Sequence, residues 1–494
     1  MKLALKQIAE SIGAEVVVPP SMNLRPVDPS TVVESVYALG YSIDTRTILP
    51  GELFFAVIGE RLDGHDFVAA ALAAGAVAAV VDRKHLPSLP AAGPLLVVED
   101  TLAALQALAT FVRGLWGGRL IAITGSAGKT STKEITASIL ATSFRVLKSE
   151  GNLNNHFGLP LQLLKLDYGY ELAVMELGMS HSGEIAALAK IAKPDIGVVT
   201  CVAPVHLGFF SSVAEIARAK YELVQALPPN GIAVLNADDD YVSQFGRNFS
   251  GKVVTFAISH PADVRAQAIR PQGGRGSEFE VITGDSSTPA LLPLIGEHNI
   301  YNALAAIAVA VECGMSPASA AAALSFATPA DKRGQVLQLG GATVINDCYN
   351  SNPKALESMV DALAAMELPD ESSGHHRRIV VAGEMLELGP ASEELHRGAG
   401  RYMAEHKVDF LLGVRGDAQY MVESAKAAGL EAQYVETAAE AGGWLVKNVR
   451  PGDIVLLKAS RGVRLEHALE HWNSRVLEHV GTPAAGPDRG STRH

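Results

Sequence analysis

The sequence predicts an α/β protein of several domains, in which mostly parallel sheets are covered by helices on both faces. Short apolar runs recur between amphipathic helices, and each run is continuously hydrophobic rather than alternating. Strands that are buried on both faces of a parallel sheet have this pattern. The chain has 494 residues, of which 48% are hydrophobic and 19% are charged. This length and composition suit about two to four domains, each with its own core, and exclude a disordered chain.

Composition shifts divide the chain into three blocks and a tail, at residues 1–115, 116–330, 331–482 and 483–494. In the first block, Gly75 separates a predicted helix from a buried strand, as a glycine that ends a helix does. The later blocks alternate strands with helices, and their strand candidates are Leu120–Ile123, Leu172–Met175, Ile196–Val199, Ile232–Leu235, Thr343–Ile345, Arg378–Val381, Phe410–Leu412 and Ile454–Leu457. The tail is rich in Gly, Pro and polar residues and is expected to fray.

Charge and cysteine content narrow the class of protein. The formal net charge of −12 argues against a nucleic-acid-binding surface as the main function. The three cysteines are widely spaced, which fits neither a disulfide framework nor a zinc site and is typical of a reducing cytosol. The N-terminus lacks the apolar core of a signal peptide, and the apolar stretch from Phe67 to Val81 is too short to span a membrane. We therefore expect a cytoplasmic protein without a membrane span and without a nucleic-acid partner.

A glycine-rich loop is the strongest local signal. The segment Thr-Gly-Ser-Ala-Gly-Lys-Thr-Ser at 124–131 directly follows the predicted strand Leu120–Ile123 and precedes a helix. Such a loop turns backbone N–H groups toward a phosphate, its lysine reaches the β- and γ-phosphates, and its hydroxyl can ligate Mg²⁺. The full spacing of the common P-loop would place glycine where Ile123 stands, so this loop is a shortened relative. The alternative is a chance glycine-rich turn, but the position between a strand and a helix favours nucleotide binding. The expected nucleotide-binding residues are Gly125, Ser126, Ala127, Gly128, Lys129, Thr130 and Ser131.

Two polar residues follow other predicted strands of the second block. Glu176 ends the strand that begins at Leu172, and His206 lies shortly after the strand Ile196–Val199. Side chains at the carboxyl edge of a parallel sheet point into the crevice where ligands bind. Alone, Glu176 is as well explained as a solvated acid and His206 as a structural histidine. Beside a phosphate loop, a metal or phosphate role becomes the better interpretation of both.

Other polar segments are ambiguous from the residues alone. Lys220 lies in the segment Ala217–Glu222, where the default interpretation is a solvated helix face. Asn299 opens the Ala-rich helix at Ala303–Cys313, and its amide can either cap that helix or hydrogen-bond a purine. In the third block, the polar loop Lys458–Gly462 follows the last strand and suits an anion.

Short motifs along the chain form an ordered set. They are Asp44–Arg46, Gly51–Phe55, Gly64–Asp66, Gly125–Ser131, Gly151–Asn155, Glu176–Gly178, Lys220–Glu222, Gly296–Asn299, Asn346–Pro353, Gly383–Gly389 and Lys458–Gly462. In order and spacing, this set resembles the Mur ligases of peptidoglycan synthesis over nearly the whole chain. It is most similar to the branch that adds D-alanyl-D-alanine. The sibling branch that adds diaminopimelate or lysine usually carries an Asp-Asn-Pro-Arg motif in its C-terminal domain, and this sequence lacks that motif.

The resemblance implies an architecture and a reaction. It implies a UDP-sugar-binding α/β domain at 1–115, a central P-loop-type ATP-binding domain with a parallel sheet at 116–330, and a Rossmann-like C-terminal domain at 331–482. The implied reaction starts when ATP phosphorylates the terminal carboxylate of a UDP-N-acetylmuramoyl-tripeptide. The amine of D-alanyl-D-alanine then attacks the acyl phosphate, and phosphate leaves as the amide forms. A monomer is expected.

The resemblance also implies roles for individual residues. Thr130 and Glu176 are expected to hold a first Mg²⁺, and His206 with a carbamylated Lys220 a second. Lys129, Lys220 and His206 are the expected catalytic residues. ATP contacts are expected from Asn299 in the second block and from Arg333 and Asp347 in the third. The residues expected to bind the UDP-linked substrate are Thr45, Arg46, Asn154, Asn155 and Ser180.

Two other functions remain open at this point. The first is another ligase of the same class, similar to folylpolyglutamate synthase or to the diaminopimelate-adding enzyme. The second is a nucleotide-binding module that changes conformation without ligating anything. The amine that stimulates phosphate release from ATP separates the ligases, and a switch would show no such stimulation. A switch would also have no use for the motifs that are expected to bind a uridine nucleotide in the first block.

Overall fold

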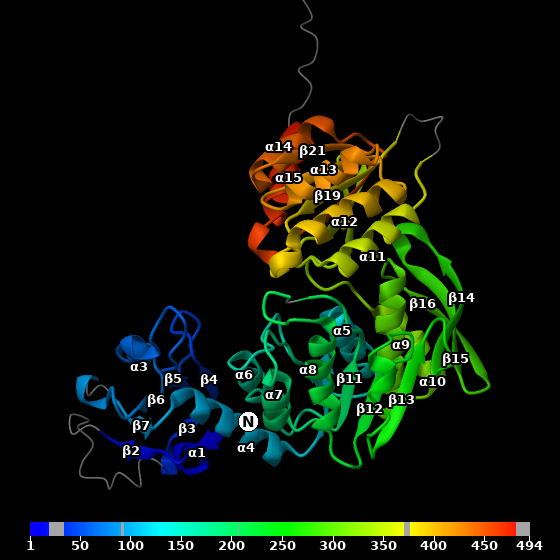
Figure 1. The fold of residues 1–494 in the computed structure, drawn as a ribbon. Helices are drawn as coiled ribbons and strands as arrows, with labels where there is room; N and C mark the ends of the chain where they lie inside the picture. The colour runs from blue at the N-terminus through cyan, green and yellow to red at the C-terminus, as the bar shows by residue number, and fades with distance from the viewer. Residues whose placement is uncertain (19–33, 90–92, 206, 370–375, 481–494) are drawn as a thin grey trace, which may run out of the picture.

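The computed structural model describes residues 1–18, 34–89, 93–205, 207–369 and 376–480. The predicted tail at 483–494 and residues 19–33 of the first block lie outside these residues. Over the described ranges the chain forms an N-terminal, a central and a C-terminal α/β domain, each built on its own main sheet (Figure 1). The sequence prediction of an α/β protein with three domains is confirmed.

The N-terminal domain contains a five-stranded sheet in the described part of the chain, with strand order β2-β7-β6-β5-β4. Strands β4 to β7 run parallel, and β2 is antiparallel at one edge. Gly75 has φ +100° and separates helix α3 from strand β6 as predicted. The elements are β1 (Leu3–Ala4), α1 (Leu5–Ile12), β2 (Glu15–Val17), β3 (Tyr37–Ala38), β4 (Gly40–Ser42), β5 (Glu52–Phe55), α3 (Val68–Ala73), β6 (Ala78–Asp82), β7 (Leu95–Val98) and α4 (Thr101–Trp116).

The central domain contains a nine-stranded sheet, counted over the described residues, with order β16-β15-β14-β13-β12-β11-β8-β10-β9. Its strands are β8 (Arg119–Thr124), β9 (Val146–Lys148), β10 (Leu172–Glu176), β11 (Ile196–Val199), β12 (Ile232–Asn236), β13 (Lys252–Ala257), β14 (Val264–Pro271), β15 (Ser277–Thr283) and β16 (Ser286–Leu292). Its helices are α5 (Lys129–Leu140), α6 (Gly158–Leu163), α7 (Glu184–Ala192), α8 (Val213–Gln225), α9 (Glu297–Glu312) and α10 (Pro317–Ala323). Strands β8 to β14 run parallel to one another, and β15 and β16 extend this sheet through the antiparallel pairs β14–β15 and β15–β16.

The central sheet is buried on both faces, as its continuous apolar strands predict. In β8, Leu120 and Ala122 pack with the helices α4, α6, α7 and α8, whereas Ile121 and Ile123 pack with α5, α9 and α10 on the opposite face. Because both faces are covered, only the ends of the parallel strands are left to meet solvent and ligands.

The C-terminal domain contains a six-stranded sheet over the described residues, with order β17-β18-β22-β19-β20-β21, in which only the edge strand β17 is antiparallel. Its elements are β17 (Gln335–Leu339), β18 (Ala342–Asp347), α11 (Pro353–Ala364), β19 (Arg378–Gly383), α12 (Ser392–Glu405), β20 (Phe410–Val414), α13 (Ala418–Ala427), β21 (Glu431–Val435), α14 (Ala438–Asn448), β22 (Ile454–Lys458) and α15 (Glu466–Val480). Figure 1 shows this domain above the central domain, with the N-terminal domain beside the central one. None of the helices formed by the described residues combines the length and the apolar character that crossing a membrane requires.

Candidate functional site

The glycine-rich loop leaves strand β8 at the carboxyl edge of the central sheet and enters helix α5. Its two glycines are required by the backbone. Gly125 has φ +149°, and a Cβ atom there would lie 1.8 Å from Oγ1 of Thr200. Gly128 has φ +81°, and its Cβ would lie 2.4 Å from Oδ1 of Asn302. Residues with side chains do not fit either position, so the loop can keep this shape only with glycine.

Hydrogen bonds from the segment after β11 hold the loop in place. The Ser126 N–H donates to the carbonyl of Cys201 at 2.8 Å. The Ser126 hydroxyl accepts a hydrogen bond from the Ala203 N–H at 2.9 Å. The Thr200 hydroxyl donates to the carbonyl of Ala127. The Ser126 side chain therefore supports the loop, while the N–H groups at the start of helix α5 suit the binding of a phosphate.

Lys129 is the first residue of helix α5 and folds back over the loop. Its Nζ donates to the Gly125 carbonyl at 2.8 Å. Burial is the main reason that the pKa of Lys129 lies below its usual value; the Glu176 carboxylate opposes this lowering, and the Arg333 guanidinium adds to it. A lysine at the start of a phosphate-binding helix is placed to contact phosphate oxygens.

Glu176 joins two of the predicted site residues. It ends strand β10, where it is in register with Ile123 at the end of β8, and it is only 3% exposed. The Thr130 hydroxyl donates to Oε2 of Glu176 at 2.7 Å, and Nδ2 of Asn154 donates to Oε1 at 2.8 Å. A hydroxyl and a carboxylate oxygen in contact at the end of a phosphate loop are hard donors that suit Mg²⁺.

Lys220 contradicts the default interpretation of a solvated lysine. On helix α8 its side chain is 2% exposed, and no hydrogen bond or ion pair joins it to another described residue. Burial, together with the positive charge of Lys129, holds the pKa of Lys220 well below its usual value. The other cation of this helix, Arg218, is solvated instead, with a side chain that is 73% exposed. His206, the other residue expected near Lys220, lies outside the described residues.

Two asparagines on helix α9 form a hydrogen-bonded pair beside the phosphate loop, and only Asn299 was predicted from the sequence. Asn299 does not cap the helix, because Gly296 is the N-cap residue. Its Nδ2 donates to the Ile295 carbonyl, and its Oδ1 accepts from Nδ2 of Asn302 at 3.0 Å. Asn302 in turn accepts from the Thr132 hydroxyl of helix α5 at 3.1 Å. The spacing of three residues places both asparagines on one helix face, and this was the signal for Asn302.

The C-terminal domain contributes charges that reach the central site. The Arg333 guanidinium stacks 4.1 Å from the centre of the Tyr349 ring, and its charge acts on Lys129 of the loop. The Asp347 carboxylate pairs with Lys458 at the carboxyl edge of the C-terminal sheet. Burial lowers the pKa of His298 in helix α9 to about 4, and the charges of Asp347 and Lys458 act on it in opposite senses. The two predicted C-terminal residues therefore lie at the interface with the central domain.

The residues expected at the UDP-linked substrate lie in three places. Thr45 and Arg46 follow strand β4 in the N-terminal domain, where the Arg46 side chain is 86% exposed and pairs with Asp44. Asn155 accepts from the N–H of Gly158 at 2.9 Å at the start of helix α6. The Ser180 N–H donates to the Glu184 carboxylate. Of the predicted substrate residues, only Asn154 contacts the Thr130–Glu176 pair among the residues that the structure describes.

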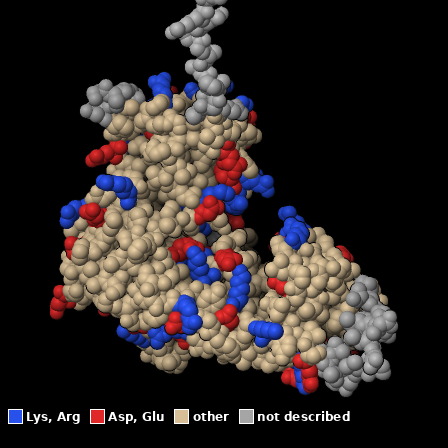
Figure 2. Space-filling model, turned by 180° about the vertical axis from the view of Figure 1, so that it is seen from behind, with Lys and Arg blue, Asp and Glu red and all other residues tan. Residues whose placement is uncertain are grey.

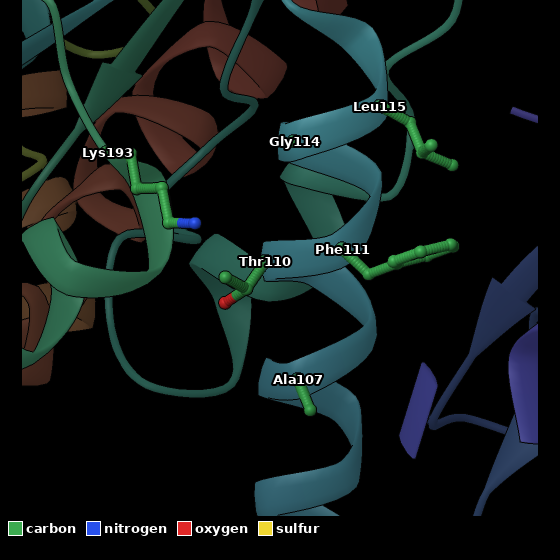
Figure 3. A pocket seen from close by; sticks show the side chains of 6 residues that line it. All are labelled: Ala107, Thr110, Phe111, Gly114, Leu115 and Lys193. Carbon is green, nitrogen blue, oxygen red and sulfur yellow. The ribbon is translucent and has the colours of Figure 1, made fainter. Parts of the chain in front are cut away.

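Two other features of the molecule carry no catalytic arrangement. An open cavity of about 540 Å³ lies between helix α4 and Lys193 at the end of α7, as Figure 3 shows, and it is lined by Ala107, Thr110, Phe111, Gly114, Leu115 and Lys193. In the N-terminal domain, Asp63, His65 and His85 lie close enough to hold a metal ion. However, the two imidazole rings are stacked at 4.0 Å and 16°, so their lone pairs do not converge, and both ring nitrogens of each histidine already contact an aspartate.

Models of the Mur ligase family match most of this chain. The family's catalytic domain matches residues 39–113, the Mur ligase middle domain residues 123–310, and the Mur ligase glutamate ligase domain residues 332–461.

Individual relatives give the same result. A Bacillus subtilis protein named UDP-N-acetylmuramoyl-tripeptide–D-alanyl-D-alanine ligase is 34% identical over 95% of this chain and 98% of its own. The crystal structure of MurF from Acinetobacter baumannii matches with a TM-score of 0.85 and 30% identity, covering 96% of this chain and 99% of that one. MurF from Thermotoga maritima in complex with ADP matches with a TM-score of 0.77 and 28% identity, covering 89% and 98% of the two chains.

Proposed function

This chain belongs to the Mur ligase family, and we propose on that basis that it is an ATP-dependent amide ligase. The proposed reaction joins D-alanyl-D-alanine to a UDP-N-acetylmuramoyl-tripeptide, as the name of the Bacillus subtilis relative states for that protein. The high coverage of both chains supports the whole reaction rather than one domain's share of it. ATP as the nucleotide is supported by the ADP complex of the Thermotoga maritima relative.

The observation that carries the proposal is the phosphate loop with its Thr130–Glu176 contact, placed beside charges of a second domain. A carboxylate is a poor acylating agent, because its oxygen is a poor leaving group. Transfer of the γ-phosphoryl group to that oxygen gives an acyl phosphate and ADP. The dipeptide amine then adds to the acyl carbon, the bond to the phosphate oxygen breaks, and the amine loses a proton. Negative charge develops on phosphoryl oxygens, where Lys129 and the loop N–H groups can stabilise it.

We propose that Thr130 and Glu176 hold a Mg²⁺ ion. Their oxygens are 2.7 Å apart and lie at the N-terminus of the phosphate-binding helix. The ion would neutralise charge on the nucleotide phosphates. His206 and Lys220 are proposed to serve a second ion. Asn299 is proposed to contact adenine, and Arg333 and Asp347 to complete the ATP site from the C-terminal domain.

We propose further that Lys220 is carbamylated. The Nζ lone pair would attack the carbon of CO₂, form an N–C bond and lose a proton to solvent, which leaves a carboxylate on the long side chain. The environment favours this, because Lys220 is buried without a counter-charge among the described residues and feels the positive charge of Lys129. The carboxylate would turn a repulsion between buried cations into an attraction and supply a hard oxygen ligand.

The carbamate has a direct test. In ¹³C-bicarbonate, the wild type should show a carbamate carbonyl signal by NMR that Lys220→Ala lacks. The alanine variant should also lose most of its activity and regain part of it when a short carboxylic acid fills the vacated space. Arg218→Ala removes an exposed cation from the same helix and should change neither the signal nor the rate. Full activity of Lys220→Ala without added acid would refute this assignment.

The N-terminal domain is proposed to bind the UDP end of the substrate through Thr45 and Arg46. The middle of that substrate, between its UDP end and the phosphate loop, would then contact Asn154, Asn155 and Ser180. We propose the domain bounds 1–115, 116–330 and 331–482, and a cytoplasmic location. We also propose a monomer, because the proposed ATP site and the proposed UDP site are both formed within one chain.

Amine selectivity tests the ligase proposal against its nearest alternatives. Phosphate release from ATP in the presence of a UDP-muramoyl-tripeptide should rise on addition of D-alanyl-D-alanine. With UDP-muramoyl-dipeptide and diaminopimelate, or with a folate and L-glutamate, it should stay at background. Stimulation by one of these other pairs would assign the chain to another ligase. ATP binding without stimulation by any amine would favour a conformational switch.

A further inference from the structure

The loop after strand β22 presents one arginine with unused donors. Arg461 begins this loop's short helical turn, and its side chain is 60% exposed. Its Nη1 donates to Oε1 of Glu466 at 2.5 Å, and its guanidinium lies 5.8 Å from the centre of the Tyr349 ring. Within the described part of the chain, Nε and Nη2 of Arg461 donate to no other residue. One edge of the guanidinium is therefore fixed by Glu466, and the other edge remains available to a planar anion.

Contacts place Arg461 at the junction between the C-terminal and central domains. The Tyr349 ring that Arg461 approaches also carries Arg333, whose charge acts on Lys129 in the phosphate loop. Next to Arg461, a Cβ on Gly462 would lie 2.8 Å from Leu386. The loop that contains Leu386 touches the central domain, because the carbonyl of Glu387 accepts from the Gly208 N–H at 3.3 Å. Figure 2 shows a recess between the lobes of the molecule with charged side chains along its border.

The charges around Arg461 favour an anionic ligand. Glu466 is 8% exposed and accepts from both Arg461 and Lys332. Arg333 adds a third cation through the shared Tyr349 ring. Two cationic side chains therefore pair with the Glu466 carboxylate, and Arg333 lies at the same tyrosine ring as Arg461. With Asp331 at 3.9 Å from Lys332 included, the group still keeps an excess of one positive charge. A carboxylate ligand would be attracted to this group despite the presence of Glu466.

The proposed reaction supplies one substrate with an unclaimed carboxylate. The ATP phosphates are assigned to the glycine-rich loop, and the carboxylate of the tripeptide is the reacting group. The dipeptide D-alanyl-D-alanine reacts through its amine and keeps its own carboxylate. In two fully extended residues, this carboxylate lies at most about 7 Å from the amine. Holding that far end would fix the direction of the amine toward the acyl carbon.

We propose that Arg461 binds the C-terminal carboxylate of the incoming D-alanyl-D-alanine, and that Glu466 and Tyr349 are positioning residues for its guanidinium. This inference rests on the proposed function. An arginine suits the task better than a lysine because its planar fork matches a carboxylate in two hydrogen bonds. The site would make the enzyme select amines that carry a free carboxylate at this distance.

The test compares two amines in two proteins. Wild type and Arg461→Met are assayed for amide formation with D-alanyl-D-alanine and with D-alanyl-D-alaninamide, which lacks the carboxylate charge. Wild type should prefer the acid by about 10- to 100-fold in kcat/KM, the range of a lost charged hydrogen bond. In Arg461→Met this preference should disappear, because kcat/KM should fall for D-alanyl-D-alanine and stay the same for the amide. The KM for ATP should not change. Arg464→Met removes an exposed arginine three residues along and should keep the full preference.

Each other outcome has a distinct meaning. Absence of ligation by wild type with either amine would refute the proposed function itself. Normal ligation without a preference for the acid, or a preference that persists in Arg461→Met, would overturn the assignment of Arg461. A raised KM for ATP with an intact preference would assign the arginine to the nucleotide instead. Arg461→Lys keeps the charge without the fork and should retain part of the preference, so the comparison holds even where the methionine variant folds poorly.

Discussion

Replacing Gly128 by alanine should damage the nucleotide site more than the change of one methyl group suggests. Gly128 has φ +81°, a conformation that costs alanine about 1–2 kcal/mol. The new Cβ would also lie 2.4 Å from Oδ1 of Asn302, so the asparagine must move. That movement breaks its 3.1 Å hydrogen bond with the Thr132 hydroxyl, which contributes about 1 kcal/mol. The free energy of unfolding of the central domain should fall by about 2–3 kcal/mol in total.

Calorimetry with ATP and thermal denaturation measure the two consequences of Gly128→Ala. ATP affinity should fall at least about tenfold, since the loop N–H groups and Asn302 shift together. The melting transition should fall by about 5 °C or more. The matched control is Gly114→Ala in helix α4, where a Cβ meets no atom within 4 Å and φ is not positive. This control should keep ATP affinity and gain about 0.4–1 kcal/mol of stability. Wild-type affinity and stability in Gly128→Ala would refute the account of the loop.

Lys129→Ala should abolish phosphate release and leave the circular dichroism spectrum unchanged, because the lysine acts chiefly on charge in the transition state. Near-normal turnover would show that the loop is not the catalytic phosphate site. Asp238→Asn should lower stability at pH 7 by about 2 kcal/mol. Burial raises the pKa of Asp238, but hydrogen bonds that include those from Ser259 and Ile258 outweigh it and hold the pKa at about 2 against 3.8. The difference in free energy of unfolding between wild type and Asp238→Asn should therefore disappear as the pH falls from about 4 to 2. Urea denaturation at several pH values measures it, and a difference that persists at pH 2 would contradict the account. Adding nucleotide together with the UDP-linked substrate should reduce the radius of gyration in small-angle scattering, since ATP contacts come from two domains; an unchanged value would count against closure.

The sequence predicted the parallel part of the fold well, because continuous apolar runs have few alternatives. The run Ile196–Val199 is strand β11 at its predicted bounds, and Leu120–Ile123 and Leu172–Met175 extend by one or two residues as β8 and β10. The parallel strands β9, β13, β14 and β21 were not among the predicted strands, and neither were the antiparallel strands β15 and β16. In β15 exposed and buried residues alternate, which is the weaker signal of a strand covered on one face.

The candidate site was predictable where a short sequence motif is enough to define the local geometry. The phosphate loop and the strand-end Glu176 were selected from spacing, and they meet through Thr130. The default interpretation of Lys220 failed because its burial depends on tertiary packing of helix α8, which local sequence does not reveal. Asn302 was missed for a related reason. Its contact with Thr132 arises between helices α5 and α9, which are far apart in the sequence.

The central claim is that the tripeptide carboxylate is activated as an acyl phosphate at the Lys129 loop, and an isotope transfer tests it most directly. The UDP-linked tripeptide is prepared with ¹⁸O in its terminal carboxylate and incubated with ATP and D-alanyl-D-alanine. If the carboxylate oxygen attacks the γ-phosphorus, each released phosphate should carry one ¹⁸O atom, detected by mass spectrometry, and the other label should remain in the new amide. Released phosphate without ¹⁸O, formed at the same rate as the amide, would contradict the account.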